Sequence, residues 1–362
     1  MDRVPQRVLN RTTLHRQWLL DRRSSGTRDA VEHLIALQAQ NPLDPYWGLW
    51  SRVQAFDPWS LSNMVESRQA VRGQLLRGTI HLSTSDDFLD LRPQVQAVLA
   101  RILGSTTFAR DTKEVDREPL LELGRALLEK EPLTRAELST RLTERWPGVA
   151  GASLAQVVTY LLPVVQVPPR GLWEGRGAAR WAPIESWVGS ELRAGTEVKA
   201  TIRRYLAAFG PASVADMRAW SGMAGLREVV DGMGSELRTY HAESGAELFD
   251  LPDLPLIDAD TPAPPRFLPE YDNVLLGHAD RSRFFVDDTA PLGWTGNLMV
   301  DGTFAGAWKP VPPKGGGPAR LEVRMLGETS RAAMRHVVEE GEALLGFAYP
   351  ASSSTEVVFI EG

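Results

Sequence analysis

Residues 133–182 read LTRAELSTRLTERWPGVAGASLAQVVTYLLPVVQVPPRGLWEGRGAARWA, and this stretch decides the fold class. Thr134 and Glu137 form a capping box that predicts the start of one helix, and Ser153 with Gln156 forms a second box that predicts the next. Together with a helix predicted upstream from Pro119, the region contains three consecutive helices.

Two strands are predicted to follow these helices. VVQV at 164–167 and GAARWA at 177–182 are separated by PPRGLWEGR, a segment rich in turn-forming residues. Three helices followed by a hairpin is the plan of a winged helix. Stretches on either side repeat this order, so we predict an α+β fold with three tandem winged-helix units.

The expected domain boundaries follow from this repetition. Residues 1–110 are expected to form the first winged helix, 111–195 the second and 196–255 the third. Residues 256–362 are expected to form a proline-rich connector and a small β-rich unit. The connector is predicted at 251–269, which contains six prolines.

A hairpin and a loop are predicted within the last unit. Asp301-Gly302 lies between two apolar runs in LMVDGTFAGAW, which is a strong hairpin signal. PVPPKGGGP at 310–318 predicts a mobile loop.

Composition restricts the class of protein. The chain has 362 residues, of which 43% are hydrophobic and 24% charged, values typical of globular proteins. It has no cysteine, no long apolar run and no N-terminal apolar segment of the kind found in secretory signals. We therefore expect a cytoplasmic protein that has no membrane contact and no thiol chemistry. We also expect a monomer, which composition does not decide.

The charge is distributed unevenly along the chain. The net charge is −6, yet residues 1–85 contain 11 Arg against 7 acidic residues. Arginine strongly outnumbers lysine, and its planar guanidinium suits phosphate contacts. A local basic surface for nucleic acid is therefore compatible with an acidic chain, although a solvated arginine surface explains the same composition.

The segment TRDAVEHLIALQAQNP at 27–42 contains the most informative anomaly. If the helix continues at about 100° per residue, Gln38 falls within the apolar stripe formed by Val31, Leu34 and Ile35. A buried carboxamide without partners costs about 1–3 kcal/mol, so Gln38 requires compensation or has a function. Pro42 predicts that the helix ends nearby, which frees Gln40 to turn toward the same cleft. The alternative is a pair of amides that cap the helix end.

Other candidate sites are weaker. The six histidines have no metal-ligand spacing, and no phosphate-binding glycine loop occurs, so we expect neither a metal nor a cofactor. The segment PEYDNVLLGHADRSRF at 269–284 concentrates polar side chains, which either support a site or lock the C-terminal unit onto the rest. The residues expected to support a site are Asp272, Asn273, His278 and Arg281 in this segment, together with Asn41 of the QAQNP stretch.

The chain resembles the AlkZ/YcaQ family of winged-helix DNA glycosylases over essentially its full length. The resemblance is carried by QAQ at 38–40, RGTIHL at 77–82, FLPEYDNVLLGHADR at 267–281 and VDGTFAGAW at 300–308. It implies a C-shaped body that receives duplex DNA on its concave face, and hydrolysis of the N-glycosidic bond of N7-alkylguanine. In some members the substrate includes interstrand crosslinks.

The resemblance also assigns expected roles to residues. Gln38 and Gln40 match the catalytic motif, and Gln at position 40 instead of Asp is similar to the AlkZ branch, which is associated with producers of azinomycin-type DNA-alkylating antibiotics. The expected partner is double-stranded DNA that carries N7-alkylguanine lesions or crosslinks. The expected enzyme is monofunctional, because the few lysines lie far from QAQ in sequence. The expected DNA contacts come from the hairpins, at Arg72, Arg77, Arg170, Arg176, Asp301, Gly302, Trp308 and Lys309.

Two other functions fit the same pattern. Winged helices commonly serve as modules of transcriptional regulators, which bind a DNA sequence without catalysis. They can also serve as protein-interaction scaffolds, which do not bind DNA in a salt-dependent way.

Overall fold

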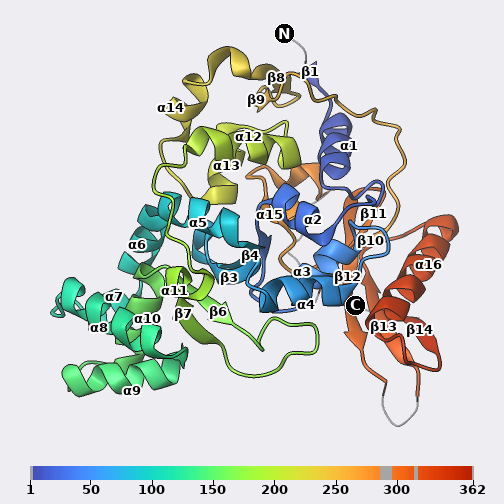
Figure 1. Ribbon diagram of the computed structural model, residues 1–362. Coiled ribbons are helices and arrows are strands. Elements are labelled where there is room, and N and C mark those ends of the chain that lie inside the picture. Colours follow the sequence, from blue (N-terminus) through green and yellow to red (C-terminus); the bar gives the residue numbers. More distant parts are fainter. Residues whose placement is uncertain (1–2, 286–295, 314–316, 361–362) are drawn as a thin grey trace.

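The computed structural model describes residues 3–285, 296–313 and 317–360 (Figure 1). The structure contains many helices and three β-sheets, which confirms the α+β fold class. None of the helices in these ranges is both long enough and apolar enough to cross a membrane. The expected loop at 310–318 lies partly outside the described residues, at 314–316.

A six-stranded sheet forms the centre of the molecule, with the strand order β2-β4-β3-β6-β7-β5. Its members are β2 (Leu37–Gln38), β3 (Ala70–Gln74), β4 (Ile80–Thr84), β5 (Leu133–Thr134), β6 (Val164–Val167) and β7 (Arg180–Pro183). The hairpin β3–β4 of the first expected unit and the hairpin β6–β7 of the second both occur. They join edge to edge, because β3 pairs with β6 through Arg72 opposite Gln166.

The first half of the chain also contains a series of helices. They are α1 (Gln6–Arg16), α2 (Thr27–Leu34), α3 (Asp44–Trp50), α4 (Pro58–Glu66), η1 (Leu76–Gly78), α5 (Ser85–Gln94), α6 (Gln96–Gly104), α7 (Thr107–Asp111), α8 (Arg117–Lys130), α9 (Arg135–Arg145), α10 (Gly151–Leu161) and α11 (Ile184–Val188).

The two predicted capping boxes have different outcomes. The box at Thr134 and Glu137 is confirmed at the start of α9. The box at Ser153 is wrong, because α10 begins at Gly151 and Ser153 instead donates to an Asp111 carboxylate oxygen at 2.6 Å.

The region 196–255 forms α12 (Val198–Phe209), α13 (Val214–Ser221), α14 (Leu226–Asp231), η2 (Gly234–Glu236), β8 (Arg238–Ala242) and β9 (Glu247–Asp250). The predicted hairpin is present, and β1 (Arg3–Val4) adds to it in parallel with β8. Strand β1 therefore packs on the third expected unit.

The C-terminal region forms a five-stranded sheet with the order β10-β11-β12-β13-β14. Its elements are β10 (Arg266–Pro269), α15 (Asn273–Leu276), η3 (Arg281–Arg283), β11 (Gly296–Val300), β12 (Thr303–Val311), β13 (Ala319–Met325), α16 (Arg331–Ala348) and β14 (Thr355–Phe359). The Asp301-Gly302 hairpin is confirmed between β11 and β12. The expected connector is four residues too long, since 266–269 is strand β10, which pairs with β11.

The C-terminal sheet does not have a core separate from the rest. One cluster of buried side chains includes Trp47 of α3, Phe267 of β10 and Trp308 of β12. In Figure 1, α3 lies beside β10 and β12, in agreement with these contacts.

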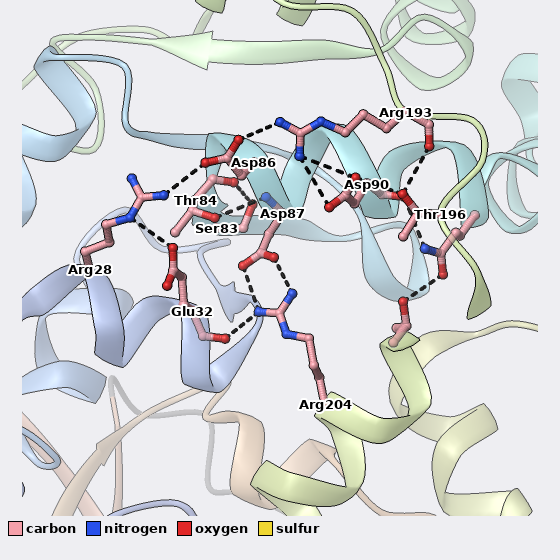
Figure 2. A network of polar contacts seen from close by, with 12 residues as sticks. Arg28, Glu32, Ser83, Thr84, Asp86, Asp87, Asp90, Arg193, Thr196 and Arg204 are labelled. Carbon is pink, nitrogen blue, oxygen red and sulfur yellow. Dashed lines mark hydrogen bonds and ion pairs between the residues drawn. The ribbon is translucent and has the colours of Figure 1, made fainter. Parts of the chain in front are cut away.

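A polar network joins the first expected unit to α12 and to the segment before it (Figure 2). Arg204 of α12 forms an ion pair with Asp87 of α5 and donates to the Glu32 carbonyl oxygen at 2.5 Å. Arg193 reaches Asp86 at 2.6 Å, and Arg28 reaches the same carboxylate at 2.9 Å. The network fixes α2, and therefore the start of the segment that continues into QAQ.

Candidate active site

Gln38 lies on a strand and not on the predicted helix. Helix α2 ends at Leu34, and Ile35 adopts φ 68°, which turns the chain away from the helical path. Gln38 then pairs with His81 across β2 and β4. The helical continuation is wrong because sheet pairing with β4 provides the backbone partners that a further helical turn would have provided.

Gln38 is buried, with 6% of its surface exposed, and it has a charged partner. Arg77 Nη2 donates to Gln38 Oε1 at 2.7 Å, while Arg77 Nη1 donates to the Trp220 carbonyl oxygen at 2.5 Å. Burial lowers the pKa of Arg77 to about 10, so it remains a cation at neutral pH. The compensation that the sequence required for Gln38 is therefore Arg77, which was expected to contact DNA.

Gln40 is exposed and lines a polar pocket of about 320 Å³. Its Oε1 accepts a hydrogen bond from the Ile80 backbone N–H at 3.0 Å, so β4 holds the amide. The other lining residues are Gln74, Gly78, Ile80, Arg135, Gln156, Tyr160 and Gln166. Gln38 is not among them, so the structure does not place both amides on this one pocket.

Arg72 supports the site from inside the sheet. It is 1% exposed and donates to the Ala39 carbonyl oxygen at 2.8 Å and to Gln166 Oε1 at 3.0 Å. Burial lowers the pKa of Arg72 to about 10. The expectation that it contacts DNA is therefore corrected: its donors hold the middle of QAQ.

Two buried ionisable groups near the site were missed in the sequence. Burial lowers the pKa of His81 to about 3, so it is neutral, and its Nε2 has no partner among the described residues. Asp44 is fully buried, and neither carboxylate oxygen has a hydrogen-bond partner in the described ranges. Burial, followed by the nearby Glu270 and Asp272 carboxylates, raises the pKa of Asp44 to about 8. Local sequence gave no signal for either, since their burial depends on distant packing.

One of the expected supporting residues bonds to the chain just before QAQ, and a second is paired with Arg52. Asn273 Nδ2 donates to the Ala36 carbonyl oxygen, just before β2. Asp272 forms a buried double hydrogen bond with Arg52, at 2.7 and 2.8 Å. The segment at 269–284 therefore both locks the C-terminal region in place and supports the candidate site.

The other expected supporting residues lie elsewhere. Asn41 lines a second pocket of about 620 Å³, together with Trp47, Trp173 and Tyr349 among others. His278 is buried, and its Nε2 lies 3.0 Å from the Phe209 carbonyl oxygen. Arg281 is exposed and covers the Phe285 ring at 4.1 Å. These contacts of His278 and Arg281 involve no residue of QAQ, and a supporting role for either side chain stays a prediction.

The loop between β6 and β7 contains the expected contacts Arg170 and Arg176. Arg170 donates to the Gly177 carbonyl oxygen at 3.2 Å, and Arg176 is exposed. Trp173 anchors the loop, since its ring lies 5.1 Å from both the Tyr46 and the Phe347 rings. Arg176 lines the same pocket as Asn41, whereas the hydrogen bond from Arg170 lies within its own loop.

The β11–β12 hairpin is held by contacts within the protein, and its role as a probe of the DNA groove stays a prediction. Asp301 forms ion pairs with Arg7 at 3.0 Å and with buried Arg11, and the Gly302 carbonyl oxygen accepts from Asn10 at 2.7 Å. The hairpin tip is therefore docked on α1.

The end of the same hairpin is also engaged within the protein. Trp308 is fully buried and donates to the Leu268 carbonyl oxygen at 2.8 Å. Lys309 pairs with Glu322 at 3.0 Å. Trp308 thus belongs to the core that the C-terminal sheet shares with α3.

Comparisons with known proteins identify the family and the fold of the chain. A family model described as "DNA glycosylase AlkZ-like" matches residues 31–347. Among solved structures, the chain is similar to Streptomyces sahachiroi DNA glycosylase AlkZ, with a TM-score of 0.70 and 24% identity over 99% of this chain and 100% of that chain. No curated protein matches the chain.

Proposed function

The chain belongs to the AlkZ-like DNA glycosylase family, and from this premise we propose that it hydrolyses the N-glycosidic bond of N7-alkylguanine in duplex DNA. The proposed substrates include bulky adducts and interstrand crosslinks left by DNA-alkylating natural products of the azinomycin type. The proposed role is base excision repair that protects a producer from its own product.

One observation carries the proposal. Gln40 is exposed on a polar pocket, while Gln38, two residues earlier, is buried and accepts a hydrogen bond from Arg77. Each carbonyl oxygen already accepts one protein N–H, and a carbonyl oxygen has a second lone pair. We assign these lone pairs to the attacking water, which the two fixed amides orient toward the sugar, Gln40 from the pocket and Gln38 from outside its lining.

The chemistry suits neutral amides. N7-alkylguanine is cationic, so the bond between N9 and C1′ breaks with its electron pair moving onto the base, which leaves as a neutral purine. The oxygen of water bonds to C1′, and its proton passes to solvent. Neither glutamine accepts a proton at neutral pH, which restricts the reaction to labile cationic lesions.

The proposal accounts for several expected features of the enzyme. No lysine lines the Gln40 pocket within the described part of the chain, which favours a monofunctional hydrolase over a lyase. Arg170 and Arg176 are proposed to contact phosphate, and the three helix-and-hairpin regions are proposed to act as winged-helix units of a monomer. An open pocket suits a crosslink, which cannot be fully extruded while it is tethered to the other strand.

Single-turnover release of N7-methylguanine from duplex DNA tests the proposal. Gln38→Ala and Gln40→Ala are each expected to slow release by about 100-fold or more, with duplex affinity unchanged. Gln54→Ala, which truncates an exposed amide away from the pocket, is the matched control. The wild-type rate is expected to be flat between pH 5.5 and 7.5, because no group assigned to the water titrates there.

The opposing outcomes are distinct. Full activity in the double variant would remove QAQ from the mechanism. Absence of release by the wild type from both methylated and crosslinked duplexes would overturn the glycosylase assignment and favour a DNA-binding regulator.

A further inference from the structure

Four glutamines line the pocket that contains Gln40, and three of them have no part in the proposed hydrolysis. Gln74 comes from β3, Gln166 from β6 and Gln156 from α10, so the pocket lies where the first two expected units meet. An amide can both donate and accept, which suits a ligand edge that carries both kinds of group.

Hydrogen bonds within the protein fix the orientation of two of these side-chain amides. Gln40 Oε1 accepts from the Ile80 N–H, and Gln166 Oε1 accepts from Arg72 at 3.0 Å. Because their oxygens are held by these donors, the amino groups of both side chains remain as donors for a ligand. Two fixed donors therefore line one part of the pocket.

Gln74 supplies the complementary acceptor. It is 4% exposed, and its Oε1 is buried without a hydrogen-bond partner among the described residues. An unpaired buried acceptor costs about 1–3 kcal/mol. No group in the described ranges holds this oxygen, so rotation about the last side-chain bond can turn it toward a ligand that donates a hydrogen bond.

The ligand that fits has an acceptor beside a donor. In the minor groove, guanine presents N3 as an acceptor and the N2 amino group as a donor, whereas adenine presents only N3. We propose, on the basis of the proposed function, that this pocket reads the minor-groove edge of the damaged guanine. Gln40 and Gln166 donate to N3, and Gln74 Oε1 accepts from the N2 amino group.

This arrangement is consistent with the bond that breaks. N3 and N9 are both bonded to the same purine carbon, so an amide at N3 is also close to the glycosidic bond. The alkyl group on N7 lies on the opposite edge, in the major groove. A bulky adduct or a crosslink therefore does not need to enter the pocket. Gln74 is a specificity-determining residue in this scheme, and it does not touch the water.

Equilibrium binding separates recognition from catalysis. The probes are two duplexes that contain 2′-fluoro nucleosides, which resist glycosidic cleavage: one carries 7-methylguanine, and the other carries 7-methylhypoxanthine, which lacks only the N2 amino group. We expect the wild type to bind the guanine duplex about 3- to 10-fold more tightly, as one hydrogen bond predicts.

The variants assign that preference to one atom. Gln74→Met removes the acceptor and is expected to reduce the preference to about one. Gln74→Glu keeps an acceptor and is expected to retain it. Gln69→Met, which alters an exposed glutamine just before β3, is expected to behave like the wild type.

The outcomes distinguish this inference from the proposed function. Equal binding of the two duplexes by the wild type would overturn the inference even if excision is normal, and so would a preference that survives in Gln74→Met. The wild-type comparison needs no variant to fold. A preference present without excision of cleavable N7-methylguanine would support the pocket while overturning the proposed function.

Discussion

Buried arginines hold the candidate site at the scale of single residues. Arg77 holds Gln38, and Arg72 holds Ala39 and Gln166. The planar guanidinium donates in several directions at once, which a lysine ammonium cannot reproduce at the same geometry. The sequence predicted DNA contacts for these side chains from their place in the hairpins, and a hairpin position does not reveal which side chains are buried.

Arg77→Lys is expected to slow excision by about 10- to 100-fold with little change in duplex affinity, since one ammonium cannot hold both Gln38 and the Trp220 carbonyl oxygen. The measurement is single-turnover release of 7-methylguanine. Arg101→Lys is the matched control, because Arg101 is exposed and donates to the Gly222 carbonyl oxygen. In a Gln38→Ala background the Arg77 substitution should add little, and a fully additive effect would contradict the coupling.

Asp44 predicts a pH dependence of stability. Its pKa is about 8 in the folded protein and near 3.9 when unfolded, so between these values the folded state keeps a proton that the unfolded state releases. The free energy of unfolding therefore falls as pH rises through this window, by at most about 1.4 kcal/mol per pH unit.

Asp44→Asn is expected to remove this contribution, so that the free energy of unfolding changes less between pH 5 and pH 8, by about 1–3 kcal/mol. Urea titrations at both pH values measure the difference. Asp253→Asn, at an exposed position, should leave the pH dependence as in the wild type. The same pH dependence in Asp44→Asn would mean that the carboxyl is already ionised at pH 5.

At the scale of elements, the sequence was most informative where the signal is local. Asp301-Gly302 predicted a tight hairpin, and Thr134 with Glu137 predicted a helix start, because each depends on a few neighbouring residues. The predicted end of α2 was wrong, because α2 stops where β2 pairs with β4, a strand some 40 residues later in the chain. The docking of the hairpin tip on α1 could likewise not be predicted from neighbouring residues, because α1 is nearly 300 residues away in sequence.

Gly302 tests that docking. It has φ 77°, and a Cβ there would lie 2.5 Å from Arg11 Nη1 and 2.7 Å from Leu14 Cδ1. Gly302→Ala is expected to lower the free energy of unfolding by about 2–4 kcal/mol, which combines backbone strain with overpacking. Gly245→Ala is the matched control, because Gly245 also has a positive φ in a hairpin turn but open space around it. Equal losses in the two variants would show that docking on α1 contributes nothing.

At the scale of the whole molecule, strand pairings join the three expected winged-helix units to one another. The order of elements along the chain does not reveal these pairings. Strand β3 of the first pairs with β6 of the second, and β1 adds to β8 of the third. The Gln40 pocket exists only because of the first of these pairings, since Gln74 and Gln166 come from different expected units. The family resemblance could therefore predict Gln38 and Gln40 as site residues. It could not predict the amides of Gln74, Gln156 and Gln166, which line the pocket with Gln40.

The buried pair between Arg52 and Asp272 tests whether the C-terminal region folds together with the rest. Its side chains are 0% and 1% exposed, and removing one partner leaves a buried charge, so Asp272→Asn is expected to cost about 3–5 kcal/mol. Glu356→Gln breaks the exposed pair with Arg320 and should cost less than about 1 kcal/mol.

Urea unfolding followed by tryptophan fluorescence and by circular dichroism distinguishes two models of this coupling. Because Trp47 and Trp308 share one core, both probes should shift together in Asp272→Asn. Excision should fall as well, since the adjacent Asn273 holds the Ala36 carbonyl oxygen at the start of the QAQ segment. Two separate unfolding transitions in urea, with excision lost in the transition at lower urea, would instead show that the C-terminal region folds independently. It would then support the site only when it is docked.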